Sequence, residues 1–282
     1  CLTYCPAHPN TRSAALSVTM SNQGRVLVHC FAGCAGREVM LALRDRGLLN
    51  QSGDCWRGPS ATEHHASRSN DRERRQRAAA HLWRTSRFVG SSLAQTYLRL
   101  GRGIRGAPIP STLRYHPAAS HPSDRSRSFP AMIARVDDAQ GGFLGVHRTY
   151  LAADGSGKAA VTPPRATLGP ISGGAVRLGM PGEVLAVGEG IESSLAFSVM
   201  ESVPAWAALS TSGMRRIELP SLPQASELII AADHDEGGRA AAEDLARRAR
   251  SEGRNVRIAL PPKPGTDFND VILKGDWNGP TG

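Results

Sequence analysis

The sequence predicts an α/β protein with a parallel sheet, because two short apolar runs end in acidic residues and each is followed by a helical pattern. The first run, residues 183–188, ends at Glu189, and the second, residues 228–232, ends at Asp233 and Asp235. Runs that are apolar throughout are typical of strands buried on both faces of a parallel sheet. Such sheets bind ligands at the carboxyl ends of their strands, so the three acids are expected to lie together at one rim.

Glu189, Asp233 and Asp235 would form a group of carboxylates that raise each other's pKa values unless a divalent cation lies between them. Oxygen ligands select hard cations, so Mg²⁺ or Mn²⁺ is expected here. The competing interpretation is that each acid only caps a helix or lies in its first turn, where it favours the helix dipole. The repetition of the pattern at two strand ends favours the metal site.

These residues carry a family resemblance. The order strand, Glu189-Gly190, helix, strand, Asp233-His234-Asp235 resembles the Toprim fold, which bacterial primases, type IA and type II topoisomerases and some nucleases share. Residues 265–270 follow the last predicted strand and resemble the late acidic motif of primase Toprim domains. The resemblance implies a Toprim-type parallel sheet flanked by helices, and it implies catalytic roles for four acids, namely Glu189, Asp233, Asp235 and Asp267.

The first 50 residues contain two pairs of candidate metal ligands, Cys5 with His8 and Cys30 with Cys34. The strand patterns between the pairs predict a β-hairpin, which would bring them together around one ion. Three thiolates and one imidazole with no open position describe a structural zinc site, which a module this small needs for stability. The alternatives are buried free cysteines beside a surface histidine, or ligation by His29, which we expect to point away.

The remaining cysteines and the hydropathy indicate the compartment. Five cysteines is an odd number, and Cys1 and Cys55 have no assigned role. No secretory leader and no apolar run long enough to cross a membrane is visible, so we expect a cytoplasmic protein with no membrane partner. The sequence opens without an initiator methionine, which is expected of a trimmed or partial N-terminus.

The zinc-ligand pattern resembles the zinc-binding domain of DnaG-type primases. Its Cys30–Cys34 spacing is closer to primase-like proteins of phages, plasmids and other mobile elements than to cellular primases. The middle of the chain more loosely resembles the primase region before Toprim, which implies nucleotide or template contacts for Arg102, Arg148 and Lys158; solvated surface charge is the alternative. The resemblance implies four segments: a zinc ribbon (1–50), a polar flexible linker (51–77) with a helix starting at Asp71, a basic α+β subdomain of the catalytic core (78–180) and Toprim (181–282).

The net charge of +9 favours a polyanionic partner. The resemblance implies a DNA primase that makes short RNA primers from ribonucleoside triphosphates on single-stranded DNA, by metal-dependent nucleotidyl transfer, alongside a replicative helicase. The sequence shows no Walker loop, so we do not expect ATP-driven translocation from this chain.

Two other functions stay open. A Toprim nuclease or topoisomerase would use the same acids, but all four tyrosines lie upstream of the Toprim motifs and no separate cleavage domain fits. A non-catalytic zinc and Toprim protein of recombination or plasmid maintenance would bind DNA without synthesis. Recombination mediators of this kind have a four-cysteine site directly before Toprim, so the order found here favours a primase.

Overall fold

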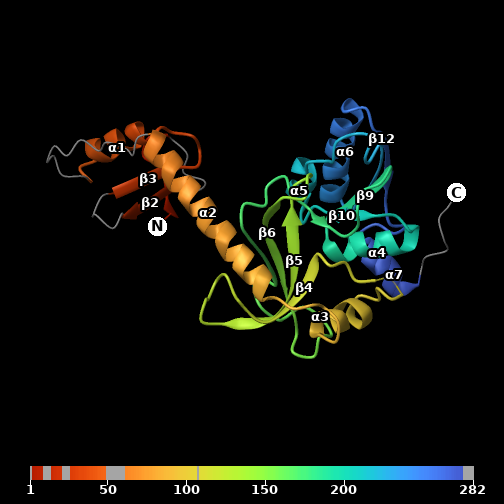
Figure 1. Cartoon of the computed structure of the whole chain (residues 1–282). Coiled ribbons are helices and arrows are strands. Elements are labelled where there is room, and N and C mark those ends of the chain that lie inside the picture. The colour runs from red at the N-terminus through yellow and green to blue at the C-terminus, as the bar shows by residue number, and fades with distance from the viewer. Residues whose placement is uncertain (1, 9–13, 21–25, 49–60, 107, 276–282) are drawn as a thin grey trace. The chain divides into compact units, whose positions relative to one another are not determined.

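The chain forms two compact units, Cys1–Ala61 and Thr62–Gly282, and each is described by itself (Figure 1). The computed structural model describes residues 2–8, 14–20, 26–48, 61–106 and 108–275. Among these residues, no helix combines the length and the apolar character that crossing a membrane requires.

The described part of the first unit contains a small antiparallel sheet and one helix. Its elements are β1 (Leu2–Thr3), β2 (Leu16–Met20), β3 (Val26–Cys30) and α1 (Gly36–Asp45), with the strands in the order β1-β2-β3. The register pairs Leu16 with Cys30, so the predicted hairpin is present. Among the described residues of this unit, the apolar cluster has four buried members, Cys5, Leu16, Cys30 and Val39, with a few partly buried side chains packed against them. A core of this size is small for a module that has no further cross-links.

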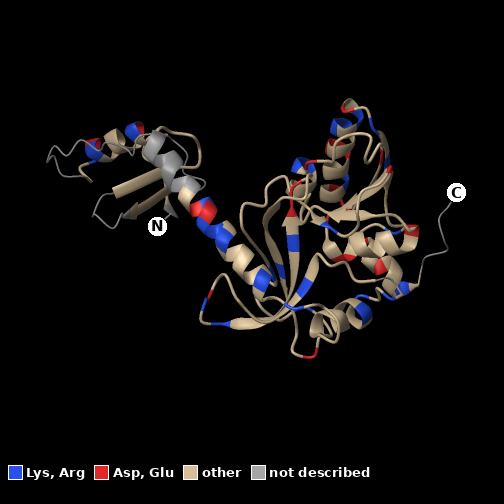
Figure 2. Cartoon of the chain, viewed as in Figure 1, with Lys and Arg blue, Asp and Glu red and all other residues tan. Residues whose placement is uncertain are grey.

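The long helix α2 (Ala61–Thr85) opens the second unit and begins ten residues before the predicted start at Asp71. Residues 61–77 of the predicted flexible linker are therefore helical, whereas residues 51–60 lie outside the described residues. A polar composition prevents a segment from forming a core, but a solvated helix can still form with local ion pairs such as Arg74–Asp71. Basic and acidic residues follow each other along this part of α2 (Figure 2).

The first sheet of this unit is antiparallel and is covered on both faces. Its strands, in spatial order, are β4 (Leu113–Ser120), β5 (Ser128–Asp137), β6 (Phe143–Tyr150) and β7 (Arg165–Leu168). Ala79 of α2 packs on one face, against Ile133 and Tyr150. The short helix α3 (Leu93–Thr96) and the π-helix η1 (Tyr97–Gly101) contribute Ala94 and Tyr97 to the cluster on the other face. The predicted hairpin of residues 131–151 is β5 and β6.

The second sheet carries the predicted parallel strands. In spatial order these are β12 (Asn255–Ala259), β11 (Glu227–Ala231), β9 (Val184–Gly188), β10 (Ala205–Ala207) and the antiparallel edge strand β8 (Val176–Arg177). The helices are α4 (Ile191–Glu201), α5 (Thr211–Arg216), α6 (Glu236–Ser251) and α7 (Phe268–Lys274). Side chains of α5 and α6 pack on one face, and side chains of α4 and α7 pack on the other. The predicted α/β class is confirmed.

Candidate catalytic and metal-binding sites

The two acidic strand ends are neighbours. Strands β9 and β11 are parallel, and their register pairs Gly188 with Ala231, so both strands end at the same level of the sheet. Glu189 follows β9 and Asp233 lies two residues beyond β11. The sheet thus presents both carboxylates at its carboxyl edge, as the sequence predicted.

Asp233 is the carboxylate whose environment is most perturbed. Burial raises its pKa to about 7, with further contributions from the charges of Glu189, Asp267 and Asp235. Its Oδ1 is buried and has no hydrogen-bond partner among the described residues. A buried carboxylate oxygen without a donor is unfavourable in the free protein, and a cation would satisfy it.

A glycine allows the backbone to approach Asp233 closely. A Cβ atom on Gly238, in the first turn of α6, would lie 2.5 Å from the carbonyl oxygen of Asp233. Any other residue at position 238 would displace either the helix or the loop that carries Asp233. Gly238, the second glycine after the acidic motif, therefore fixes the distance between helix and strand end.

Asp235 and Asp267 both cap helices. Asp235 Oδ1 accepts a hydrogen bond of 2.7 Å from the amide of Gly238, and Asp267 Oδ1 accepts one of 2.9 Å from the amide of Asp270. The alternative interpretation, that these acids are helix caps, is thus correct for one oxygen of each residue. Each carboxylate keeps a second oxygen, so capping does not exclude metal binding.

The acids raise each other's pKa values, but their carboxylates do not converge on a single point. Burial raises the pKa of Glu189, and Asp235 raises it further. Burial also raises the pKa of Asp267, to which Asp270 and Glu192 contribute. Among the described residues, the acids do not form a compact group of ligand atoms like that of Cys5, His8, Cys30 and Cys34. The donor set is therefore open and suits a hard cation that keeps water or substrate oxygens as further ligands.

A cavity of about 150 Å³ lies at this edge and combines acids with cations. Its lining includes Glu189, Asp233 and Asp267, together with the basic residues Arg102, Lys158 and Arg165. Asp235 is exposed and is not part of this lining. Arg165 was not among the predicted residues, although it ends the basic and proline-containing segment that begins at Lys158.

Sequence reasoning also missed a buried ionic group in the wall of the cavity. Glu192, in the first turn of α4, is 6% exposed and accepts a hydrogen bond of 2.6 Å from the hydroxyl of Tyr97. Lys158 Nζ lies 4.0 Å from the same carboxylate oxygen. Burial alone would raise the pKa of Glu192, but Lys158 and the Tyr97 hydroxyl lower it overall. One indication of this group was present in the sequence: Glu192 follows Glu189 by three residues, so both are expected near the start of the same helix.

Arg148 does not reach the cavity, in contrast to the predicted nucleotide or template contact. It is 7% exposed, and its Nη1 donates a hydrogen bond of 3.0 Å to the carbonyl of Ser120. Its cross-strand partner is Ile133, which packs with α2, whereas the next residue towards the start of β6, His147, lies on the opposite face. Because strand side chains alternate between faces, Arg148 points towards α2 and away from the cavity.

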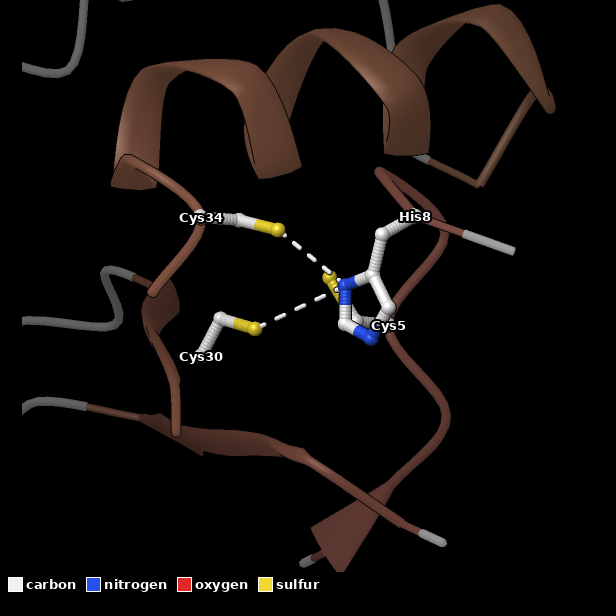
Figure 3. Close-up of side chains that lie close together, drawn as sticks. All are labelled: Cys5, His8, Cys30 and Cys34. Carbon is white, nitrogen blue, oxygen red and sulfur yellow. Dashed lines mark hydrogen bonds between the residues drawn. The ribbon is translucent and has the colours of Figure 1, made fainter. Parts of the chain in front are cut away.

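The four predicted soft ligands of the first unit do meet (Figure 3). The ligand atoms of Cys5, His8, Cys30 and Cys34 all lie within 4.8 Å of one another. His8 Nδ1 lies 3.1 Å from the sulfur of Cys34 and 3.8 Å from that of Cys30. His29 instead packs its ring against Phe31, as expected of a side chain that points away from the group.

The thiols of this group are free rather than disulfide-bonded. Loss of hydration raises the pKa of Cys34 to about 11, and the neighbouring sulfurs of Cys30 and Cys5 add to the rise. The pKa of Cys30 is lowered instead: burial raises it, but hydrogen bonds from the backbone at Cys34 and Ala32 and from the neighbouring thiols outweigh that effect. Ionisation of one thiol thus opposes ionisation of the next unless a cation compensates the charge, which fits a metal-binding group. Cys1 and Cys55 lie outside the described residues.

Two family models match the second unit. Residues 73–178 match a domain of unknown function (DUF7146), and residues 184–276 match the Toprim domain. The comparison with curated proteins gives no match.

Several solved primase structures are similar to this chain. A DNA primase domain from Pseudomonas aeruginosa is 16% identical, with a TM-score of 0.47 over 73% of this chain and 75% of that one. A DnaG primase catalytic domain bound to single-stranded DNA is 17% identical, with a TM-score of 0.45 over 73% of this chain and 76% of that one. The zinc-binding and RNA polymerase domains of Aquifex aeolicus primase are 14% identical, with a TM-score of 0.43 over 97% and 75%.

Proposed function

We propose, from the premise that residues 184–276 form a Toprim domain, that this chain is a primase that synthesises short RNA primers on single-stranded DNA. The observation that carries the proposal is the cavity at the ends of β9 and β11. It combines carboxylates able to hold divalent cations with basic residues able to hold phosphates. Both are needed to transfer a nucleotide from a triphosphate to a hydroxyl.

The acids would hold Mg²⁺ or Mn²⁺ through Glu189, Asp233 and Asp235, with Asp267 as a further ligand. The buried and unpartnered oxygen of Asp233 and the raised pKa values of three of these acids support this assignment. When bound, such cations lower the pKa of an attacking 3′-hydroxyl and balance the charge of the phosphates. The protein's own task is to hold Glu189, Asp233 and Asp267 in the wall of the cavity, where a cation would favour their ionised forms.

The basic residues of the cavity would bind the incoming ribonucleoside triphosphate. Arg102, Lys158 and Arg165 supply three positive charges beside the carboxylates. Guanidinium groups bind phosphate oxygens with two parallel hydrogen bonds, and an ammonium group acts as a point charge. Together they would neutralise the triphosphate and favour the departure of pyrophosphate.

The first unit would bind one structural zinc ion through Cys5, His8, Cys30 and Cys34, and would contact the single-stranded template. The soft donor set, the close approach of its four atoms and the small core support the zinc assignment. A replicative helicase is the expected partner protein, and the expected location is the cytoplasm. The four segment boundaries inferred from the sequence remain part of this proposal.

Incorporation of labelled ribonucleotides on single-stranded DNA, with Mg²⁺ or Mn²⁺ titrated, tests the proposal. Asp233→Asn keeps the shape of the side chain but removes its charge. We expect it to lower incorporation by at least about 100-fold, the scale of a lost electrostatic contact to a transition state. Its DNA affinity should be equal or slightly higher, because repulsion of the phosphates falls.

Asp244→Asn is the matched control, since Asp244 lies on α6 and pairs with Arg215 at the surface. It should retain incorporation. Normal synthesis by Asp233→Asn would contradict the proposal. Wild-type protein that binds DNA without incorporating nucleotide would favour the non-catalytic alternative, and cleavage of the DNA would favour a Toprim nuclease.

A further inference from the structure

A chain of short contacts connects the surface of the cavity with its buried interior. Arg102 Nε donates a hydrogen bond of 2.9 Å to the hydroxyl of Tyr97, which itself donates one of 2.6 Å to Glu192. The ring of Tyr97 also lies under the guanidinium, 5.0 Å from its carbon. Tyr97 is fully buried, so the hydroxyl has a fixed position between a cation and an anion.

The backbone around Arg102 is held on both sides. A Cβ atom on Gly101 would lie 2.6 Å from the carbonyl of Ser156, and Gly103 has a φ of +67°, which favours glycine. Asn269 of α7 donates a hydrogen bond of 2.7 Å to the carbonyl of Arg102 and accepts a longer one, 3.4 Å, from its Nη1. Among the residues that the structure describes, Nη2 of Arg102 donates to no protein acceptor.

Glu192 supplies the negative charge of this chain. A buried carboxylate is costly unless it is paired and hydrogen-bonded. Here the compensation comes from the Tyr97 hydroxyl and from Lys158, whose Nζ lies 4.0 Å from the same oxygen that Tyr97 contacts. One carboxylate oxygen therefore fixes both cationic side chains, one directly and one through a tyrosine.

We propose that Tyr97 and Glu192 are positioning residues that hold Arg102 and Lys158 ready for the triphosphate of an incoming nucleotide. The inference rests on the proposed function for the identity of that ligand. Neither residue needs to touch the substrate. Because the two cations are fixed before binding, less conformational entropy is lost when the phosphates arrive.

Tyr97→Phe tests the inference, because it keeps the buried ring and removes only the hydroxyl. We expect the KM for ribonucleotides to rise about tenfold, the effect of one lost hydrogen bond to a charged group. The kcat should change by less than about threefold, because the metal-binding acids are untouched. The dissociation constant of Mg²⁺–ATP, measured by calorimetry on the full chain without DNA, should rise by the same factor as KM.

Tyr150→Phe is the matched control. It removes the hydroxyl of another fully buried tyrosine, whose hydrogen bond of 2.8 Å goes to the carbonyl of Ser120 and not to the cavity. It should lower the melting temperature without changing KM or the affinity for Mg²⁺–ATP. A purely structural role for Tyr97 would give this same pattern and would overturn the inference.

Glu192→Gln provides a second variant that keeps the shape and an acceptor oxygen. It should also raise KM, and its effect should be less than additive with that of Tyr97→Phe, because both act on one contact chain. Additive effects would contradict the inference. If the wild type binds Mg²⁺–ATP but incorporates nothing, the proposed function fails, while the effect of Tyr97→Phe on ATP binding still decides the inference. A wild type that does not bind Mg²⁺–ATP overturns both.

Discussion

The two candidate metal sites of this chain collect their ligands in opposite ways. In the first unit, three sulfurs and one nitrogen lie within 4.8 Å of one another, and no further polar group is needed to complete a tetrahedron. At the edge of the Toprim sheet, Glu189, Asp233 and Asp267 line a cavity together with basic side chains, and Asp235 lies outside this lining. The first arrangement is closed and suits a structural ion, whereas the second is open and suits an ion that arrives with substrate.

The ligands of the two sites also differ in their structural roles. Cys5 and Cys30 belong to the small buried core of their unit, so metal binding and folding involve the same residues. Asp235 and Asp267 cap helices of a sheet that already has large apolar clusters on both faces. Removal of the ion should therefore unfold the first unit and leave the second one folded.

The largest expected effect is on the folding of the first unit. Cys30→Ser, or chelation of the metal, should release one equivalent of zinc and unfold residues 1–50, since structural zinc binding contributes about 10 kcal/mol or more. Zinc content and the amide NMR spectrum of the full chain measure this. His29→Asn, which changes an exposed histidine of β3 outside the ligand group, should keep its zinc. A zinc-free wild type, or a Cys30–Cys34 disulfide in reducing buffer, contradicts the prediction.

A smaller effect is expected from pH on the open site. The pKa of Asp233 is raised to about 7, so protons compete with Mg²⁺ below that pH. The affinity for Mg²⁺ should fall about tenfold between pH 8 and pH 6, with uptake of the ion at pH 6 releasing about one proton. The metal-free fold, conversely, should lose stability as the pH rises from 3.8 to about 7, because it binds this proton more tightly than the unfolded chain does. Calorimetric titration in buffers of different ionisation enthalpy measures both affinity and proton release, and a flat pH profile contradicts the prediction.

The smallest effect is expected at Asp267. Asparagine caps helices as well as aspartate, so Asp267→Asn keeps α7 intact and removes only a charge. Incorporation should fall about threefold to tenfold, less than for Asp233→Asn, because a loop rather than a strand end positions Asp267. Asp267→Ala should additionally cost about 1 kcal/mol of stability through loss of the cap. An Asp267→Asn variant as inactive as Asp233→Asn would show that the two acids bind the ion equally.

Local patterns in the sequence were enough to predict the parts of the fold that depend on local physics. The apolar runs at 183–188 and 228–232 predicted two strands whose ends meet, and the spacing of Cys5 with His8 and of Cys30 with Cys34 predicted one ligand group. Strands β8 and β10 were missed because two or three residues show no periodicity. The sequence did not predict the early start of α2, because a polar segment without apolar periodicity is typical of a flexible chain.

The site was predicted less completely than the fold, because its contacts join distant segments. Tyr97 and Glu192 are 95 residues apart, and no sequence pattern predicts that the two side chains are in contact. Arg148 was predicted to contact nucleotide or template, but its side chain lies on the face of the sheet away from the cavity, and the neighbouring strand position lies on the opposite face. Motifs thus identified which residue types are present at the sheet edge, and only the packing of η1, β6 and α4 shows which of them converge.

The helix caps at Asp235 and Asp267 have a consequence for measurement. Each carboxylate would divide its two oxygens between a backbone amide, that of Gly238 or Asp270, and the space where a cation would bind. A cation that draws electron density from one oxygen weakens the other as an acceptor, so the chemical shift and hydrogen-exchange rate of these two amides should follow metal occupancy. The chain therefore contains two built-in backbone probes, one at the start of α6 and one at the start of α7, that can follow ion binding without a label on the site itself.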